Sequence, residues 1–238
     1  MNTWKWLIAA SIFACLFAGA TISVPAQQSL FSRPPDTRDL GQGLGSDRDV
    51  DIVPGVRQQG ASDFTLPNPS RISDVHWYGF YSGTFTPPPG SVQFRVRIFD
   101  DAGGAPVAIP LYDSLTTASL APLAIVQNQQ TYVFRSPLPV SFTADAGRRY
   151  WFSVLEIDPN TGRPFSWFLS SLTAPIGFAS RNTEGGDWVV VENAPVLSFA
   201  LFGSVVPEPS TFVLAGIGIV AMLSTTLVKK ARNRSVRN

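Results

Sequence analysis

The residue types that most often carry out catalysis are scarce in this chain of 238 residues, which has one histidine and one cysteine. His76 would have to serve any Ser-His-Asp or Cys-His triad, but it lies within a predicted strand beside Trp77, without a nucleophile-elbow motif. A single cysteine, Cys15, cannot form an internal disulfide, and a single histidine cannot supply a His cluster for a metal. We therefore expect His76 to be structural or exposed.

Pairs of carboxyl groups are the second arrangement that could do chemistry. Glycoside hydrolysis needs two of them about 5 to 9.5 Å apart. Two pairs are close in sequence, Glu156 with Asp158 and Glu184 with Asp187. Residues 156 and 158 share one face of a predicted strand, as ordinary solvent-facing residues also would. A glycosidase therefore stays a third and weaker hypothesis, and we predict no catalytic residue.

Two segments place oxygen ligands at alternate positions, the spacing found in calcium-binding loops. They consist of Asp158, Asn160 and Gly162 in one segment and of Asp47, Asp49 and Asp51 in the other. The first segment lacks the further Asp and the terminal Glu of an EF-hand loop. A hairpin turn explains the first segment equally well, and a solvated polar face explains the second. We favour these alternatives and predict no metal and no cofactor.

Tryptophan side chains are candidates for a binding surface, because an exposed aromatic ring offers an apolar face to a sugar. The four candidates for ligand stacking are Trp77, Trp151, Trp167 and Trp188. Packing in the core of a domain without cysteines is the alternative, and we favour it. Exposure of these rings would support carbohydrate binding, whereas burial would not.

Charge is distributed unevenly along the chain. The formal net charge of +1 and the charged content of 15% argue against a nucleic-acid-binding protein driven by bulk charge. Residues 27–206 contain 12 Arg and no Lys against 16 acidic residues, a net charge of −4. The last ten residues carry only basic charges, at Lys229, Lys230, Arg232, Arg234 and Arg237. A basic tail after an acidic body indicates a membrane or an acidic partner at that end.

The N-terminus has the pattern of a secretory signal. Lys5 precedes an apolar run at residues 7–20, and small residues at the −3 and −1 positions would place cleavage before Gln27. The run is short for a membrane span, so a cleaved signal peptide over residues 1–26 is favoured over an anchor or a buried helix. Because Cys15 lies within this signal, the mature protein would contain no cysteine and would depend on its core for stability.

The C-terminus carries a second membrane signal. Residues 211–228 are 18 consecutive uncharged residues. A helix of that length spans about 27 Å, close to the hydrocarbon core of a bilayer. The basic cluster at residues 229–238 follows at once, so the positive-inside rule places it in the cytoplasm and the body on the opposite side. A buried core helix is the alternative, and the abrupt basic stop argues against it.

A short proline motif stands directly before this span: Pro207, Glu208 and Pro209. Two prolines around one residue favour an extended, solvated segment that cannot join a helix. The ordered set of Pro-Glu-Pro, uncharged span and basic cluster over residues 205–238 resembles the PEP-CTERM sorting domain. A rigid spacer before a membrane anchor is the alternative interpretation.

This resemblance implies how the protein is exported, anchored and processed. It implies export through the inner membrane of a Gram-negative bacterium that makes exopolysaccharide, and transient anchoring with the C-terminus in the cytoplasm. It also implies processing by an exosortase near Pro207, Glu208 and Pro209, followed by residence at the cell surface or outside the cell. The partners expected from it are the exosortase, the membrane and exopolysaccharide.

Residues 69–204 indicate one β-rich domain. Residues 92–99 alternate cleanly, with Val92, Phe94, Val96 and Ile98 on one face. Further strands are predicted at 72–81, 107–112, 122–127, 130–135, 138–143, 149–157, 164–170, 176–180, 187–191 and 196–202. Many short strands at this spacing predict an antiparallel β-sandwich of jelly-roll type. Residues 27–68 are predicted as a flexible or loosely ordered lead-in that ends in short strands at 50–53 and 61–66.

Four features of this domain follow one another: an aromatic cluster with glycine at 77–81, a turn at 100–104, the segment 146–151, and Gly-Gly-Asp-Trp at 185–188. Their order resembles uncharacterised bacterial exported domains that often precede PEP-CTERM tails, which implies a β-sandwich without known activity. We therefore predict an exported, exosortase-sorted surface or matrix protein with a non-catalytic body. A carbohydrate-binding module acting on exopolysaccharide is the alternative.

Overall fold

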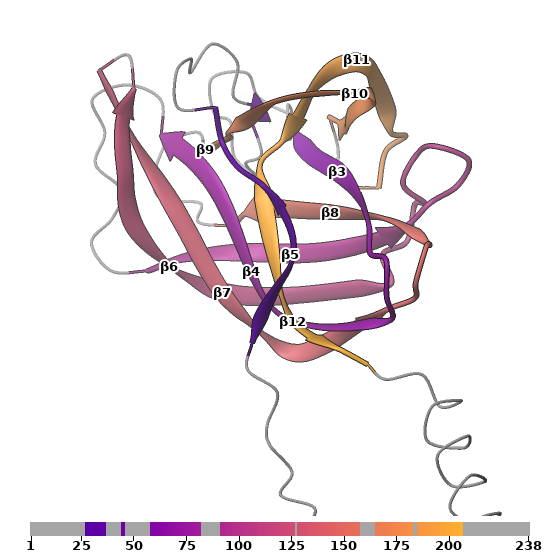
Figure 1. The fold of residues 1–238 in the computed structure, drawn as a ribbon. Helices are drawn as coiled ribbons and strands as arrows, with labels where there is room; N and C mark the ends of the chain where they lie inside the picture. Colours follow the sequence, from indigo (N-terminus) through magenta and orange to yellow (C-terminus); the bar gives the residue numbers. More distant parts are fainter. Residues whose placement is uncertain are drawn as a thin grey trace, which may run out of the picture.

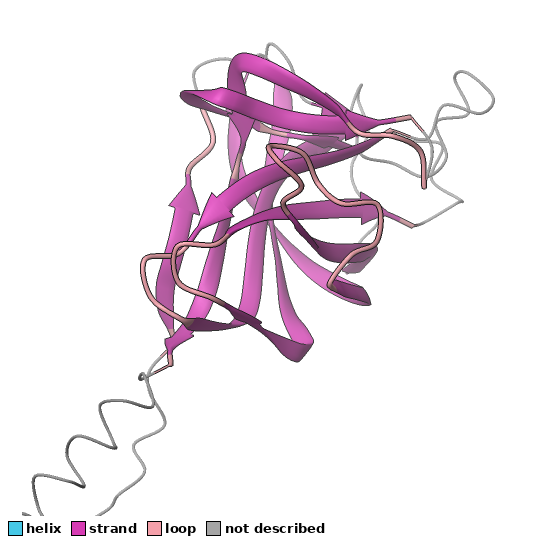
Figure 2. Ribbon diagram, turned by 90° about the vertical axis from the view of Figure 1, so that its right-hand side faces the viewer, coloured by secondary structure: helices cyan, strands magenta, loops and turns pink. Residues whose placement is uncertain are grey.

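The structure is a computed structural model that describes residues 27–36, 44–45, 58–81, 91–126, 128–157, 165–182 and 185–206. Every regular element in these ranges is a β-strand (Figure 2). In chain order the strands are β1 (Gln28–Arg33), β2 (Leu44–Gly45), β3 (Gln59–Thr65), β4 (Ser70–Tyr81), β5 (Ser91–Asp100), β6 (Tyr112–Val126), β7 (Gln129–Ala144), β8 (Arg149–Glu156), β9 (Phe165–Trp167), β10 (Leu169–Arg181), β11 (Val189–Leu197) and β12 (Phe199–Val205). Among these residues no helix has the length and apolar character needed to cross a bilayer. The predicted signal peptide, sorting motif, span and basic tail lie outside the described residues.

The strands pair antiparallel along one continuous path, β1-β12-β4-β7-β6-β5-β8-β3-β10-β11. Only Phe168 separates β9 from β10, and together these two strands connect distant parts of the path. β9 pairs with residues 79–81 of β4, while residues 179–181 of β10 pair with β3. The sheet therefore curls almost into a closed barrel around a common interior (Figure 1). The predicted all-β antiparallel class is confirmed, but one nearly closed sheet replaces the two sheets of the predicted sandwich.

Strand β5 illustrates how alternation along the sequence builds this interior. Its apolar residues Val92, Phe94, Val96 and Ile98 are at most 1% exposed, as the sequence predicts. Gln93, on the other face, is exposed. The Phe94 ring meets three aromatic rings from other strands, those of Trp77, Phe134 and Phe165, at centroid distances of 4.9, 5.2 and 5.1 Å. In a domain without cysteines, such burial, at roughly 25 cal/mol per Å² of apolar surface, is the main source of stability.

The sheet begins earlier in the chain than predicted. Within residues 27–68, predicted as a loose lead-in, β1 pairs with β12, and β3 pairs with β8 and β10. Phe31 of β1 lies 5.2 Å from the ring of Phe199, and Arg33 Nη2 lies 3.0 Å from Asp63 Oδ1. The lead-in prediction is thus wrong for β1, while the predicted strand at 61–66 corresponds to β3. The predicted strand at 50–53 lies outside the described residues.

Most other strands lie where the alternation predicts them, but several are longer. The predicted strands 130–135 and 138–143 form one strand, β7, and β6 begins ten residues before the predicted 122–127. Residues 107–111 are not a strand but part of the loop after β5. This loop is closed by backbone hydrogen bonds, from Ala102 N–H to the Ala105 carbonyl at 2.7 Å and from Val107 N–H to the Asp100 carbonyl at 3.1 Å.

Candidate functional site

Strand β12 carries the chain to the predicted sorting motif. It lies between β1 and β4, so it is hydrogen-bonded along both edges. Its inward residues Phe199 and Leu201 are fully buried. The next residue after the strand, Val206, donates its N–H to the Pro69 carbonyl at 2.8 Å. The sheet therefore ends at Val205, and only Val206 separates it from Pro207; Pro207, Glu208 and Pro209 themselves lie outside the described residues.

Three of the four tryptophans predicted as ligand-stacking candidates are fully buried: Trp77 and Trp167 in the barrel interior, and Trp151 in a second apolar cluster with Phe99. Trp77, Trp151 and Trp167 have no exposed surface. Trp167 Nε1 donates to the Ser198 carbonyl at 2.8 Å, and Trp151 Nε1 donates to Asp101 Oδ1 at 2.9 Å. For these three the stacking hypothesis is wrong, because a fully buried ring has no face for a ligand, and the core-packing alternative holds.

The fourth candidate, Trp188, is half-buried on the outside of the barrel. The guanidinium carbon of Arg181 lies over its ring, 4.4 Å from the centroid, and Phe99 meets it edge-on at 5.3 Å. Arg181 is itself positioned by Gln59, whose Oε1 accepts a hydrogen bond from Arg181 Nε at 2.8 Å. A cation over an indole is a stabilising contact, so the structure gives Trp188 a packing role.

The carboxylate pairs are only partly described. Glu156 lies at the end of β8 with no exposed surface, and Tyr81 Oη donates to its Oε1 at 2.8 Å. Asp187 is exposed. Their partners Asp158 and Glu184 lie outside the described residues, so both carboxylate pairs stay predictions. Glu156 is therefore a hydrogen-bonded interior residue rather than the solvent-facing side chain considered above.

His76 lies on the outward face of β4. Its Nε2 is 2.9 Å from Asp74 Oδ1, and its ring centroid is 4.3 Å from that of Phe202. Both side chains of the pair are about one-fifth exposed, at 20% and 21%. His76 thus bridges neighbouring positions of β4 and β12 and meets no nucleophile in the described contacts. Within the described part of the chain, no three His, Cys, Asp or Glu side chains gather in an arrangement that could hold a metal.

Two segments of the sequence carry the candidate calcium ligands. Asp158, Asn160 and Gly162, and likewise Asp47, Asp49 and Asp51, all lie outside the described residues. The calcium and turn alternatives for the first segment both remain predictions.

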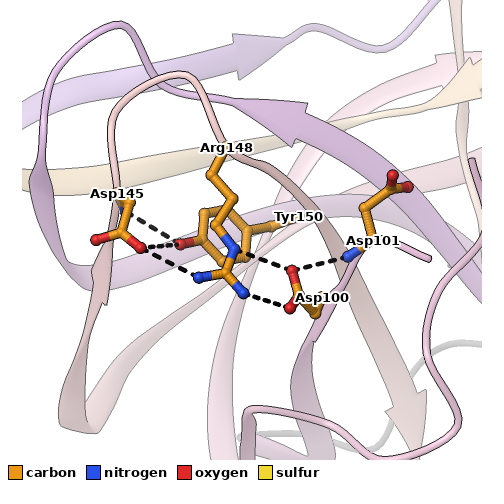
Figure 3. A network of polar contacts seen from close by, with 5 residues as sticks. All are labelled: Asp100, Asp101, Asp145, Arg148 and Tyr150. Carbon is orange, nitrogen blue, oxygen red and sulfur yellow. Dashed lines mark hydrogen bonds and ion pairs between the residues drawn. The ribbon is translucent and has the colours of Figure 1, made fainter. Parts of the chain in front are cut away.

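A charged network that the sequence does not predict links the turn after β5 to the turn between β7 and β8 (Figure 3). Arg148, after β7, donates from Nε to Asp100 Oδ1 at 3.0 Å and from Nη2 to the second oxygen of Asp100. Its Nη1 donates to Asp145 Oδ2 at 3.2 Å. Asp101, next to Asp100, accepts from Trp151 Nε1 and from the Gly104 N–H. We call Asp100, Asp101, Asp145, Arg148 and Tyr150 the turn latch.

The electrostatics of the turn latch are those of a structural ion pair. The hydrogen bonds from Arg148 hold the pKa of Asp100 below its usual value, and the same bonds raise the pKa of Arg148. Burial raises the pKa of Tyr150, whose hydroxyl accepts from the Asp145 N–H at 3.0 Å. Asp100 is therefore ionised and Tyr150 neutral near pH 7. The Asp100 and Asp101 oxygens accept hydrogen bonds from Arg148, from Trp151 and from the Gly104 N–H, so the latch joins two turns of the barrel.

A second polar cluster lies between the outer face of the barrel and the segments that cover it. Arg97 is only 4% exposed although the alternation of β5 predicts a solvent-facing position. It donates from Nε to Asp113 Oδ2 at 3.1 Å. Gln59, 2% exposed, donates from Nε2 to Ser153 Oγ at 2.8 Å. Period-2 alternation identifies the two faces of a strand but not what covers the outer one, so the sequence gives no signal for this cluster.

Comparison with known proteins identifies the C-terminal segment. Residues 205–226 match the PEP-CTERM protein-sorting motif. The match begins at the last residue of β12 and includes Pro207, Glu208 and Pro209. No curated protein matches the chain. Proteins with this motif are exported, anchored at the cell surface and processed by an exosortase. The chain therefore carries a PEP-CTERM protein-sorting motif directly after an all-β domain.

Proposed function

We propose that this protein is an exosortase-sorted component of the cell surface or extracellular matrix whose β-domain is not catalytic. The observation that carries the proposal is the match at residues 205–226, which starts where the folded sheet ends. An extended proline segment between a folded domain and a membrane span is accessible to a membrane enzyme working at the outer interface. In this account the span at 211–228 anchors the protein until the exosortase removes it.

The described residues support a structural rather than a catalytic body. Polar side chains of the types that often serve in catalysis make hydrogen bonds or ion pairs within the domain: His76 with Asp74, Glu156 with Tyr81, and Arg148 with Asp100. The carbohydrate-binding alternative loses its main support, because three of its four candidate tryptophans lie in the core. Exopolysaccharide remains a matrix neighbour in the proposal rather than a ligand of a defined site.

Replacing Pro207, Glu208 and Pro209 together with alanine tests the sorting role. The variant should be exported, because the N-terminal signal is intact, but should keep its C-terminal span and stay in the membrane fraction. Intact mass and fractionation of the exported protein measure this directly. The matched control replaces Pro87, Pro88 and Pro89 with alanine, a similar loss of prolines outside the tail, and should be processed as wild type. Normal processing of the Pro-Glu-Pro variant would refute the proposal.

A further inference from the structure

Strand β7 contains an irregularity that exposes an apolar segment. In the pairing of β4 with β7, Ile72 lies opposite Phe142 and Asp74 lies opposite Pro137. β4 advances two residues while β7 advances five, so β7 has three extra residues at this point. We call residues 137–141, Pro-Leu-Pro-Val-Ser, the β7 knuckle.

The β7 knuckle is apolar and uncharged. Leu138 is 7% exposed and anchors the segment in the core, whereas Val140 is 70% exposed. Pro137 and Pro139 are also exposed. Prolines cannot donate to a strand ladder, which explains why the segment leaves the regular pairing. The exposed apolar side chain of Val140, together with the two exposed prolines that precede it, is a candidate contact surface.

The β7 knuckle ends three residues before the end of β7, close to the end of the barrel from which the chain leaves for the proposed membrane span. Ser70 of β4 lies opposite Val205 of β12 on one side and Ala144 of β7 on the other. Two strand spacings, about 10 Å, therefore separate the end of β12 from the end of β7. Figure 1 shows β7 turning at the lower end of the domain, where β12 ends and β1 begins. Val205 itself is 39% exposed.

The length of the connection limits how far this end can stand from the bilayer. Four residues, Pro207 to Ser210, separate Val206 from the first residue of the predicted span. Even fully extended, the five Cα–Cα steps from Val206 to Thr211 cover at most about 18 Å. Val206 is fixed to Pro69 by its hydrogen bond, so this tether starts at the folded surface. While the proposed span anchors the chain, the barrel end that bears the β7 knuckle is thus held within about 18 Å of the hydrocarbon core of the bilayer.

We infer that the β7 knuckle rests on the lipid surface while the protein is anchored, with Val140 in the interfacial layer. This inference rests on the proposed anchoring by residues 211–228. The contact orients the barrel, so that the β6–β7 hairpin near Ile125 points away from the membrane. It also keeps Pro207, Glu208 and Pro209 close to the plane in which a membrane enzyme would act. Removal of the span ends the tether and frees the surface.

Single cysteine labels test this contact, because the described domain contains no cysteine of its own. Val140→Cys and Ile125→Cys, each in the full chain with Cys15→Ser, would carry an environment-sensitive fluorophore. Ile125 is the matched control, since it is 73% exposed and lies next to the β6–β7 turn. Both proteins would be placed in vesicles of phosphatidylethanolamine and phosphatidylglycerol. The same labels on a chain ending at Val206 provide the untethered reference.

The label at position 140 should shift its emission to shorter wavelength in vesicles and show about two-fold slower quenching by aqueous iodide than on the untethered chain. The label at position 125 should behave alike in both. Equal quenching of the two labels in vesicles would overturn the inference while leaving the anchor intact. A full chain that fails to sediment with the vesicles would instead refute the anchoring, and the inference with it.

Discussion

The most informative stability test replaces Phe199, the first residue of the strand that leads into the sorting motif. Phe199 is fully buried, and its ring lies 4.8 Å from Phe152, 5.2 Å from Phe31, 6.2 Å from Phe64 and 6.3 Å from Trp167. These rings come from β8, β1, β3 and β9. Phe199→Ala would therefore remove a contact shared by strands that are distant in sequence.

The expected loss in the free energy of unfolding follows from the complete burial of Phe199. Phe→Ala substitutions at such sites cost about 3 to 5 kcal/mol, through lost transfer free energy and the cavity left behind. A domain of this size has a free energy of unfolding of about 5 to 15 kcal/mol, so the loss is a large part of the total. With a urea m-value of about 2 to 3 kcal/mol/M, the unfolding midpoint should fall by about 1 to 2.5 M.

Urea unfolding of the exported protein, followed by near-ultraviolet circular dichroism, measures this shift. Phe202→Ala is the matched control, since Phe202 lies on the outer face of the same strand and meets only His76 among the described rings. It should cost about 1 kcal/mol. Equal shifts for the two variants would refute the conclusion that β12 belongs to the barrel interior and not to a loose connection before the sorting motif.

Two glycines and the ion pair of the turn latch provide further tests of the fold. A Cβ at Gly203 would stand 1.9 Å from the Arg71 carbonyl oxygen, so Gly203→Ala should cost at least about 3 kcal/mol in urea unfolding. Gly103, at φ +71° with open space around it, should lose only about 1 kcal/mol on the same change; the reverse order would contradict the β4–β12 register. Because Arg148 lowers the pKa of Asp100, their pairing stabilises the fold above the ordinary Asp pKa of 3.8 and is lost as pH falls below it. The melting temperature of Arg148→Ala should thus lie below that of wild type at pH 7, and the gap should close on acidification; a gap independent of pH would contradict this role.

Local patterns predict much of the fold, whereas contacts between distant segments do not follow from them. The alternation in β5 identifies the face that lines the barrel interior because apolar residues occupy every second position from Val92 to Ile98. β1 escapes prediction because its partner β12 lies about 170 residues later in the chain and its own residues, Gln-Ser-Leu-Phe-Ser-Arg, show no clear period. The curling of the sheet depends on β9 and β10 bridging β4 and β3, a relation that no local pattern contains.

The residues of the candidate site also differ in how far the sequence predicts their roles. The sorting motif is linear, so Pro207, Glu208 and Pro209 are recognisable without a structure. The role of the tryptophans cannot be recognised from the sequence, because an indole suits a core as well as a binding surface and only burial distinguishes the two roles. The turn latch depends on Arg148 meeting Asp100, 48 residues earlier in the chain. The burial of Arg97 depends on what covers the outer face of its strand.

The central claim is that an all-β body ends at β12 and is followed by a tail that an exosortase removes. Intact mass spectrometry of the exported protein, from cells with and without their exosortase, tests it most directly. We predict a product that ends at or after Val206 and lacks residues 211–228 in the first strain, and a chain that retains them in the second. The same C-terminus in both strains, or a product cut within β12, would contradict the account.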